Sequence, residues 1–222
     1  MNGRGNLPRI LYPADCGSFD ALAEFSRAFD PHQEGAPEWV PVRVGDRVPI
    51  GKGRFLSVLP NEHSEAACRQ TKSVSYRVEE ERRRLRPEHA ALIGPEIGAL
   101  KKAQGEDAVT TVACRPLLGY SGDATFSNGE LWESVPVLIH EATFLGDVKT
   151  EGLAQKHRHC VLSDVVAMAA RLPVETLILG HFSTRYSHEQ IIEAVGEECE
   201  RSQFQGRVAH VLPGENRVIE CP

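Results

Sequence analysis

The sequence predicts a protein of the α/β class, and residues 135–186 carry most of that prediction. An apolar run at residues 135–139 is followed by a polar loop, and then by apolar residues spaced three or four apart from Leu162 to Ala170. That spacing is typical of a helix with one buried face. A second apolar run, residues 176–179, completes a strand–helix–strand unit, and polar residues follow both strands. α/β proteins build sites at such strand ends, which are rigid and open to solvent.

The other elements are expected on both sides of this unit. A strand at residues 9–12 precedes a helix from Ser18 to about Phe29, with one side formed by Leu22, Phe25, Ser26 and Phe29. Ser187 and Gln190 match a capping box at the start of a later helix, which is expected to bury Ile191, Ile192 and Val195. Further strands are expected at residues 42–48, 51–59, 73–79, 107–113, 117–120, 208–212 and 217–220.

A dense run of charges lies in the middle of the chain. Residues 79–86 read EEERRRLR, so three glutamates stand against four arginines. A basic patch for nucleic acid is one interpretation, but a solvated strand end or turn is the better one. Residues 87–104 after it are expected to form short helical pieces, limited by Pro95 and Gly98.

Composition excludes several classes of protein. The 222 residues fit one domain spanning residues 1–222, with 41% hydrophobic and 25% charged residues. The net charge of -6 gives no overall attraction to nucleic acid. Six scattered cysteines without a CxxC pair favour reduced thiols over disulfides. Since neither a signal peptide nor a membrane-spanning apolar run is visible, we expect a cytoplasmic protein that does not enter a membrane.

Three candidate metal ligands stand directly after apolar runs, each at an expected strand end: His63, Asp123 and His181. A dinuclear zinc hydrolase needs imidazoles that hold each ion and a carboxylate that bridges them. Taken singly, each residue is more often structural, since a histidine at a strand end or an aspartate in a turn is common.

His159 and Glu141 are the candidates for acid–base chemistry. His159 lies just before the expected helix, and Glu141 ends the strand behind the loop. A histidine oriented by a carboxylate can act as general acid, although a histidine satisfied by a backbone carbonyl is the commoner case. His157 and His140 are weaker candidates, and we expect His140 to pack or hydrogen-bond locally. Arg185 either clamps a phosphate or holds a loop.

Several segments together resemble the RNase Z branch of the metallo-β-lactamase fold. The matching segments are PNEH at 60–63, SYRVEE at 75–80, YSGDAT at 120–125, LIHEATF at 138–144 and LGHFSTRY at 179–186. The resemblance implies a four-layer αββα sandwich and a hydrolase that cleaves phosphodiesters with two zinc ions, typically at the 3′ end of precursor tRNA. It also implies zinc ligation by His63, Asp123 and His181, with Asp123 as the bridge. His159 with Glu141 would donate the proton, and Ser183 and Arg185 would bind substrate. A homodimer is implied as well.

The sequence departs from the family pattern in three places. The His-x-His-x-Asp-His motif is absent, and we expect the chain to begin just after it, without the opening strands. Three ligands for two ions leave about two protein contacts per ion, against the three or four usual for zinc. Residues 12–42 leave no room for the long basic arm with which tRNA-processing members hold tRNA, so we expect no such arm. Cys160 replaces the expected serine cap, and Ser163 is expected to cap a shorter helix.

Three hypotheses therefore compete. The chain is an RNase Z-like hydrolase whose motif lies upstream, a catalytically inactive remnant that acts as a binding module, or a subunit completed by a second chain.

Overall fold

The computed structural model describes residues 8–29, 37–61, 63, 71–126, 129–146, 154 and 157–215, together with the backbone of residues 218–220. Most of its strands belong to one mixed sheet with the order β10-β9-β8-β7-β6-β5-β4-β3. Its strands are β3 (Arg47–Gly51), β4 (Arg54–Leu59), β5 (Ser75–Leu85), β6 (Thr110–Tyr120), β7 (Val137–Glu141), β8 (Thr176–Gly180), β9 (Arg207–Val211) and β10 (Val218–Glu220). A two-stranded parallel sheet pairs β1 (Arg9–Pro13) with β2 (Glu38–Val42).

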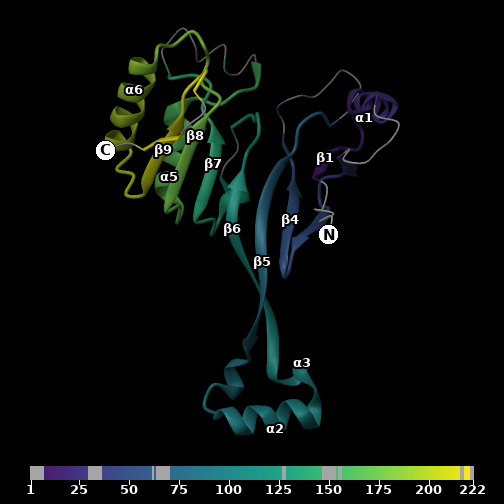
Figure 1. Ribbon diagram of the computed structural model, residues 1–222. Coiled ribbons are helices and arrows are strands. Elements are labelled where there is room, and N and C mark those ends of the chain that lie inside the picture. Colours follow the sequence, from purple (N-terminus) through teal and green to yellow (C-terminus); the bar gives the residue numbers. More distant parts are fainter. Residues whose placement is uncertain are drawn as a thin grey trace, which may run out of the picture.

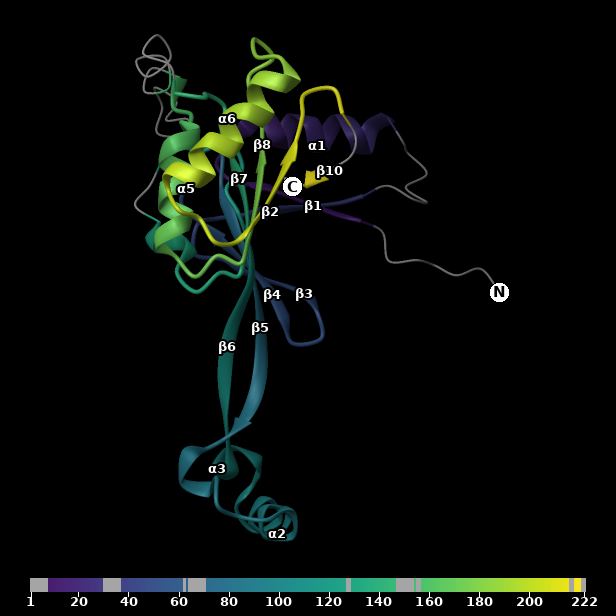
Figure 2. The same ribbon diagram turned by 90° about the vertical axis from the view of Figure 1, so that its left-hand side faces the viewer.

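Helices lie on both sides of the large sheet, so the expected α/β layering is confirmed. Helices α5 (Leu162–Arg171) and α6 (His188–Arg201) cover one face, and the small sheet with helix α1 (Gly17–Phe29) lies on the other side (Figures 1 and 2). The main core fills the space between β7–β9 and the two helices; among its fully buried residues are Leu138, Leu177, Leu179, Val165 and Ile191. A smaller core joins the small sheet to β4 through Val42, Val58 and Val74.

The helices of the main core form for reasons visible in the sequence. Helix α6 begins at the predicted capping box, in which the Ser187 hydroxyl accepts from the Gln190 N–H and the Gln190 side chain accepts from the Ser187 N–H. Ile191 and Val195 are fully buried as predicted, but Ile192 is 41% exposed. Helix α5 begins after Val161 without a side-chain cap, so the predicted cap by Ser163 was wrong.

An arm protrudes from the large sheet (Figure 1). Beyond the body, β5 and β6 continue as a two-stranded antiparallel stalk, which ends in a 3₁₀ turn (Pro87–His89), helix α2 (Gly94–Gln104) and the short helix α3 (Glu106–Val109). An arm was considered only within residues 12–42 of the sequence, so this arm, which lies elsewhere in the chain, was not predicted. The expected strand end at residues 79–86 is confirmed as part of β5, and its arginines pair with acids, Arg82 with Glu80 and Arg83 with Asp107.

Other predicted elements differ from the structure in their limits. The strand expected at residues 42–48 is interrupted by a turn between β2 and β3, in which Asp46 accepts from the Arg43 N–H and Gly45 has a φ of 95°. The two strands expected at 107–113 and 117–120 are one, β6. The expected apolar side of α1 is not buried, since Phe25 and Phe29 are 63% and 79% exposed, and Ala23 is the residue that packs.

No helix in the described part of the chain is long and apolar enough to cross a membrane. Among the cysteines that the structure describes, Cys16, Cys114, Cys160 and Cys199 are free thiols.

Candidate functional site

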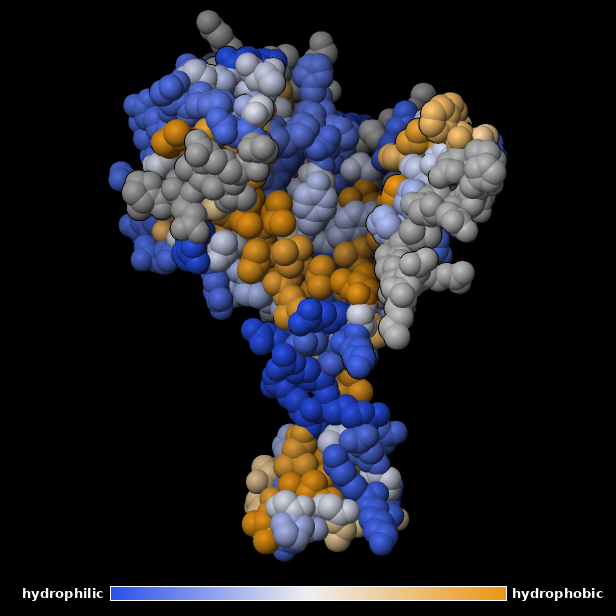
Figure 3. Space-filling model, in the orientation of Figure 1, coloured by the Kyte–Doolittle hydropathy of each residue, from blue (hydrophilic) through white to orange (hydrophobic). Residues whose placement is uncertain are grey.

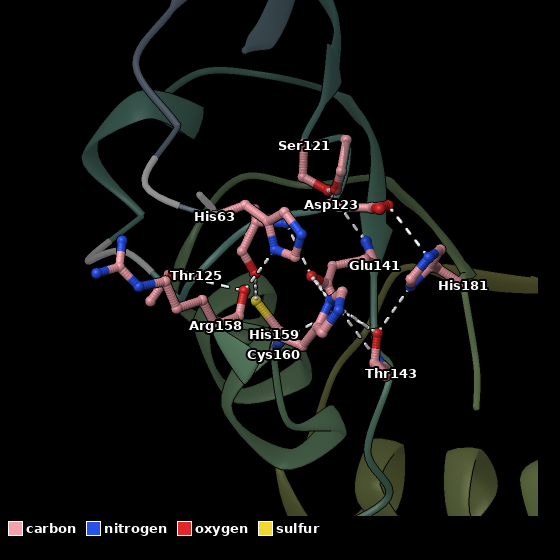
Figure 4. A network of polar contacts seen from close by, with 12 residues as sticks. His63, Ser121, Asp123, Thr125, Glu141, Thr143, Arg158, His159, Cys160 and His181 are labelled. Atoms are coloured by element: carbon pink, nitrogen blue, oxygen red, sulfur yellow. Dashed lines mark hydrogen bonds and ion pairs between the residues drawn. The ribbon is translucent and has the colours of Figure 1, made fainter. Parts of the chain in front are cut away.

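The candidate residues gather at one edge of the large sheet (Figure 4). Strands β6, β7, β8 and β9 are parallel, and β4 runs in the same direction as β6, because each is antiparallel to β5. The carboxyl ends of β4, β6, β7 and β8 therefore meet at the same edge. His63, Asp123 and His181 follow β4, β6 and β8, Glu141 is the last residue of β7, and His159 lies in the loop before α5. The topology thus brings the five sequence-predicted residues into one network.

Asp123 and His181 form the first part of this network. Oδ1 of Asp123 lies 3.3 Å from Nε2 of His181, and both side chains are about half exposed. Gly122, with a φ of 61°, turns the chain directly before Asp123. His181 itself has a φ of 60°, a backbone conformation that a residue with a side chain seldom adopts and that is common at functional sites.

His63 forms the second part. Its Nδ1–H donates to the carbonyl oxygen of Arg158 at 2.8 Å, which leaves Nε2 as the nitrogen with a free lone pair. The His63 ring lies 4.5 Å from that of His159, measured between ring centroids. Asn61 holds the turn, since its Oδ1 accepts from the His63 N–H and its Nδ2 donates to the carbonyl oxygen of Ser121.

Glu141 and His159 form the third part. Nδ1–H of His159 donates to Oε1 of Glu141 at 2.9 Å. The Glu141 side chain is 1% exposed and accepts further hydrogen bonds from the backbone N–H groups of Ala124, Thr143 and Cys160 and from the Thr143 hydroxyl. Because Nδ1 of His159 is engaged, its Nε2 is the nitrogen left to exchange a proton with a ligand. The arrangement suits a general acid oriented by a carboxylate.

Some of these side chains have the geometry of metal ligands. Two ligand atoms of a tetrahedral zinc ion, with bonds of about 2.0–2.2 Å, lie about 3.3–3.6 Å apart. The separation of Asp123 Oδ1 and His181 Nε2 is 3.3 Å, and the second nitrogen of His181 is hydrogen-bonded, as in most metal-ligating histidines. His63, Glu141 and His159 also offer ligand atoms within 4.8 Å of one another. Both Glu141 oxygens already accept hydrogen bonds, however. We therefore interpret this cluster as a carboxylate that orients His159, and not as a metal site.

The predicted substrate residues lie beside the network. Arg185 donates from Nε to Ser183 Oγ at 3.0 Å, and its guanidinium lies over the Phe144 ring at 5.5 Å from the centroid. Arg185 remains exposed, so its guanidinium still faces solvent next to the site. A pocket opens beside His159; it is lined by Thr125, Phe126, Ala154, His159, Val161, Ser163 and Asp164.

Two weaker candidates have structural roles. His140 is buried and donates from Nδ1 to the carbonyl oxygen of Glu141 at 2.8 Å, and burial lowers the pKa of His140. The local packing predicted for it is confirmed. Burial likewise raises the pKa of the Cys160 thiol, which keeps it protonated and unreactive.

Sequence reasoning missed Asn61 and Thr143. Each lies two residues from a candidate, Asn61 before His63 and Thr143 after Glu141, inside the PNEH and HEATF segments. The only available signal was that both are polar residues within segments that carry the resemblance.

No protein-family model matches the chain. The chain is 29% identical over 164 residues to the chloroplastic tRNase Z TRZ2 of Arabidopsis thaliana, covering 71% of this chain and 44% of the relative. It is 27% identical over 195 residues to the tRNase Z TRZ1 of the same plant, covering 85% and 66%. The chain thus spans between about two fifths and two thirds of the length of these relatives.

Solved structures agree in fold. The metallo-β-lactamase fold protein YhfI of Bacillus subtilis superimposes with a TM-score of 0.53 at 14% identity, covering 90% of this chain and 62% of that one. The short form of human tRNase Z gives 0.52 at 17% identity, covering 99% and 70%. The shared fold therefore shows that the chain has the metallo-β-lactamase fold, and its sequence is similar to those of tRNase Z proteins.

Proposed function

We propose that the chain carries the acid–base half and part of the metal site of a hydrolase that cuts phosphodiester bonds, of the kind that processes the 3′ end of RNA such as precursor tRNA. The observation that supports it most is the His159–Glu141 hydrogen bond of 2.9 Å beside the Asp123–His181 pair. A proton donor next to a pair of metal-type ligands is what hydrolysis of a phosphodiester needs.

In this proposal each residue has a separate task. Asp123, His181 and His63 would hold zinc, with two ions in the complete site, and the bound metal supplies a hydroxide nucleophile at neutral pH. Glu141 fixes the ring of His159, so that Nε2 delivers a proton to the leaving oxygen. Arg185, held by Ser183, would bind a phosphate of the substrate next to the site. The resemblance also supports a homodimer, which belongs to the same proposal.

The test is cleavage of a precursor tRNA by the purified chain with added Zn²⁺, comparing the chain with the variant His159→Ala. Loss of a general acid should lower the rate about 10²- to 10⁴-fold. His157→Ala is the matched control, because His157 is exposed, lies two residues away and has no part in the mechanism. A measurable cleavage rate that His159→Ala leaves unchanged would contradict the proposed acid.

A second candidate is a subunit that another polypeptide completes, and one observation favours it. Leu138, Leu177 and Leu179 point toward α5 and α6 and are buried. Their neighbours on the opposite face of the sheet, Val137, Ile139 and Ile178, remain partly exposed. Parallel strands are usually buried on both faces. Figure 3 looks onto this face, and apolar side chains gather over its middle.

The same assay separates the two candidates. Cleavage by the chain alone would support the hydrolase proposal. If the chain alone leaves the RNA intact and gains activity only when a second polypeptide is added, the subunit interpretation is correct instead.

A further inference from the structure

The hydroxyl of Thr143 lies where three functional side chains meet (Figure 4). Thr143 is buried, at 7% exposure. Its Oγ1 lies 2.6 Å from Oε2 of Glu141, 2.8 Å from Nδ1 of His181 and 3.3 Å from Nδ1 of His159. The last of these is a secondary contact, because Nδ1–H of His159 donates to Glu141 at the shorter distance of 2.9 Å.

The direction of these hydrogen bonds follows from the number of protons available. A hydroxyl has one proton to donate and two lone pairs that accept. Every other partner of Glu141 Oε2 is a backbone N–H, from Thr143 and Cys160, so the carboxylate is an acceptor and takes the hydroxyl proton. Oγ1 of Thr143 can then only accept from His181, and Nδ1 of His181 must carry a proton.

This direction decides which nitrogen of the neutral His181 ring carries the lone pair. With the proton on Nδ1, the neutral ring has its lone pair on Nε2, the atom that lies 3.3 Å from Asp123 Oδ1. A ring held in the other tautomer would present an N–H to that position. Metal-ligating histidines are oriented in this way by a partner on the second nitrogen.

Thr143 also holds the backbone next to His181. Its carbonyl oxygen accepts from the Ser183 N–H at 3.0 Å, and the neighbouring Ala142 N–H donates to the Gly180 carbonyl oxygen at 2.9 Å. These bonds flank His181 on both sides, at the position where the backbone has its unusual φ of 60°.

We propose that Thr143 is a positioning residue that sets the tautomer of His181 and links it to the Glu141–His159 pair through one hydroxyl. This inference rests on the proposed function, in which His181 Nε2 binds a metal ion and His159 is the acid. Thr143 orients His181 for the first role, and Glu141 orients His159 for the second. One buried carboxylate thereby orients both imidazoles, His159 directly and His181 through Thr143.

The test compares Thr143→Val with Thr143→Ser by NMR of the metal-free chain at alkaline pH, using the nitrogen chemical shifts of the imidazole rings. Valine keeps the shape of threonine and removes the hydroxyl, whereas serine keeps the hydroxyl. The chain and Thr143→Ser should show His181 with its proton on Nδ1. Thr143→Val should show a mixture of tautomers or the Nε2–H form, and its affinity for Zn²⁺ alone should fall about 10- to 100-fold.

The signals of His140 provide the control for folding, since this ring is bonded to a backbone carbonyl on the buried side of β7 and should not change. An unchanged tautomer of His181 in Thr143→Val would overturn the inference, as would an Nε2–H ring in the unaltered chain.

The two failures can be told apart. If Thr143→Val changes the tautomer but no variant cleaves RNA, the positioning role stands and the proposed function fails. If the chain cleaves RNA and the tautomer does not respond to Thr143→Val, the proposed function stands and the positioning role fails.

Discussion

At the scale of the residue, Gly119 shows how closely the main core packs behind the site. A Cβ atom at this position would lie 2.6 Å and 2.8 Å from ring atoms of Trp132 and 3.1 Å from Leu138 Cδ1. Trp132 is 1% exposed and Leu138 is fully buried, so a shift of either side chain would disturb its contacts with the surrounding core.

We therefore expect Gly119→Ala to lower the free energy of unfolding by about 1–3 kcal/mol, as overpacked cores do. Urea denaturation followed by tryptophan fluorescence measures the change. Gly98→Ala is the matched control, because a Cβ at Gly98 in helix α2 meets nothing within 4 Å. It should be neutral or stabilising by up to about 1 kcal/mol. A Gly119→Ala variant as stable as the unaltered chain would show that the core yields more easily than its packing indicates.

The gathering of the five candidate residues could be predicted from the sequence, because each follows an apolar run or precedes a helix and strand ends of a parallel sheet converge. The hydrogen bonds that orient them could not. Thr143 and Asn61 act through distances of 2.8–3.2 Å to residues far along the chain, such as His181 and Ser121. No local pattern encodes such contacts.

At the scale of the element, the arm is the part that the sequence predicted least well. A two-stranded stalk has no buried face, so residues 79–86 carry no apolar alternation from which a long strand would be inferred. Helix α2 was predicted, but Gly98 does not end it, and it continues to Gln104. Helix α3 was not predicted, because a strand was expected from residue 107. By contrast, β7, α5, β8 and α6 were predicted well, because each buries one face in the main core.

We expect the arm to be dispensable for the stability of the body. Helix α2 packs against α3, and α3 against the start of β6, away from both cores. Replacing residues 84–111 by a short glycine-containing turn should therefore change the melting temperature by no more than about 4 °C, the shift expected for a change of about 1 kcal/mol.

Circular dichroism on heating measures this, and the near-ultraviolet signal of the buried Trp132 provides a control for the native core. A loss of cooperative unfolding in the shortened chain would mean that the arm contributes to folding of the body.

At the scale of the whole molecule, buried histidines make stability depend on pH. Burial lowers the pKa of His140 and of His210 in the folded chain, whereas in the unfolded chain a histidine titrates near about 6.5. Below that pH the unfolded chain binds protons that the folded chain does not. The contribution of these rings to stability is therefore complete above about pH 6.5 and is lost as the pH falls toward their lowered pKa values.

The expected slope is at most about 1.4 kcal/mol per pH unit for each such histidine. Urea denaturation at several pH values between neutral and mildly acidic measures it. The variant His140→Gln removes one titrating ring and should show a shallower slope than the unaltered chain. Identical slopes for the two would contradict a neutral, buried His140.

The register of the β5–β6 pair has a consequence for where the arm points. Pairing shifts between Val78 and Glu79, and the last residue of β5 that pairs with β4 is Glu80. Outward from there the ribbon has two strands, which twist more strongly than strands inside a wide sheet. An irregularity of this kind bends a strand and increases its twist locally. The direction in which the helical tip points thus depends on this one register shift near the base of the arm. The tip lies at the end of roughly 17 Å of two-stranded ribbon.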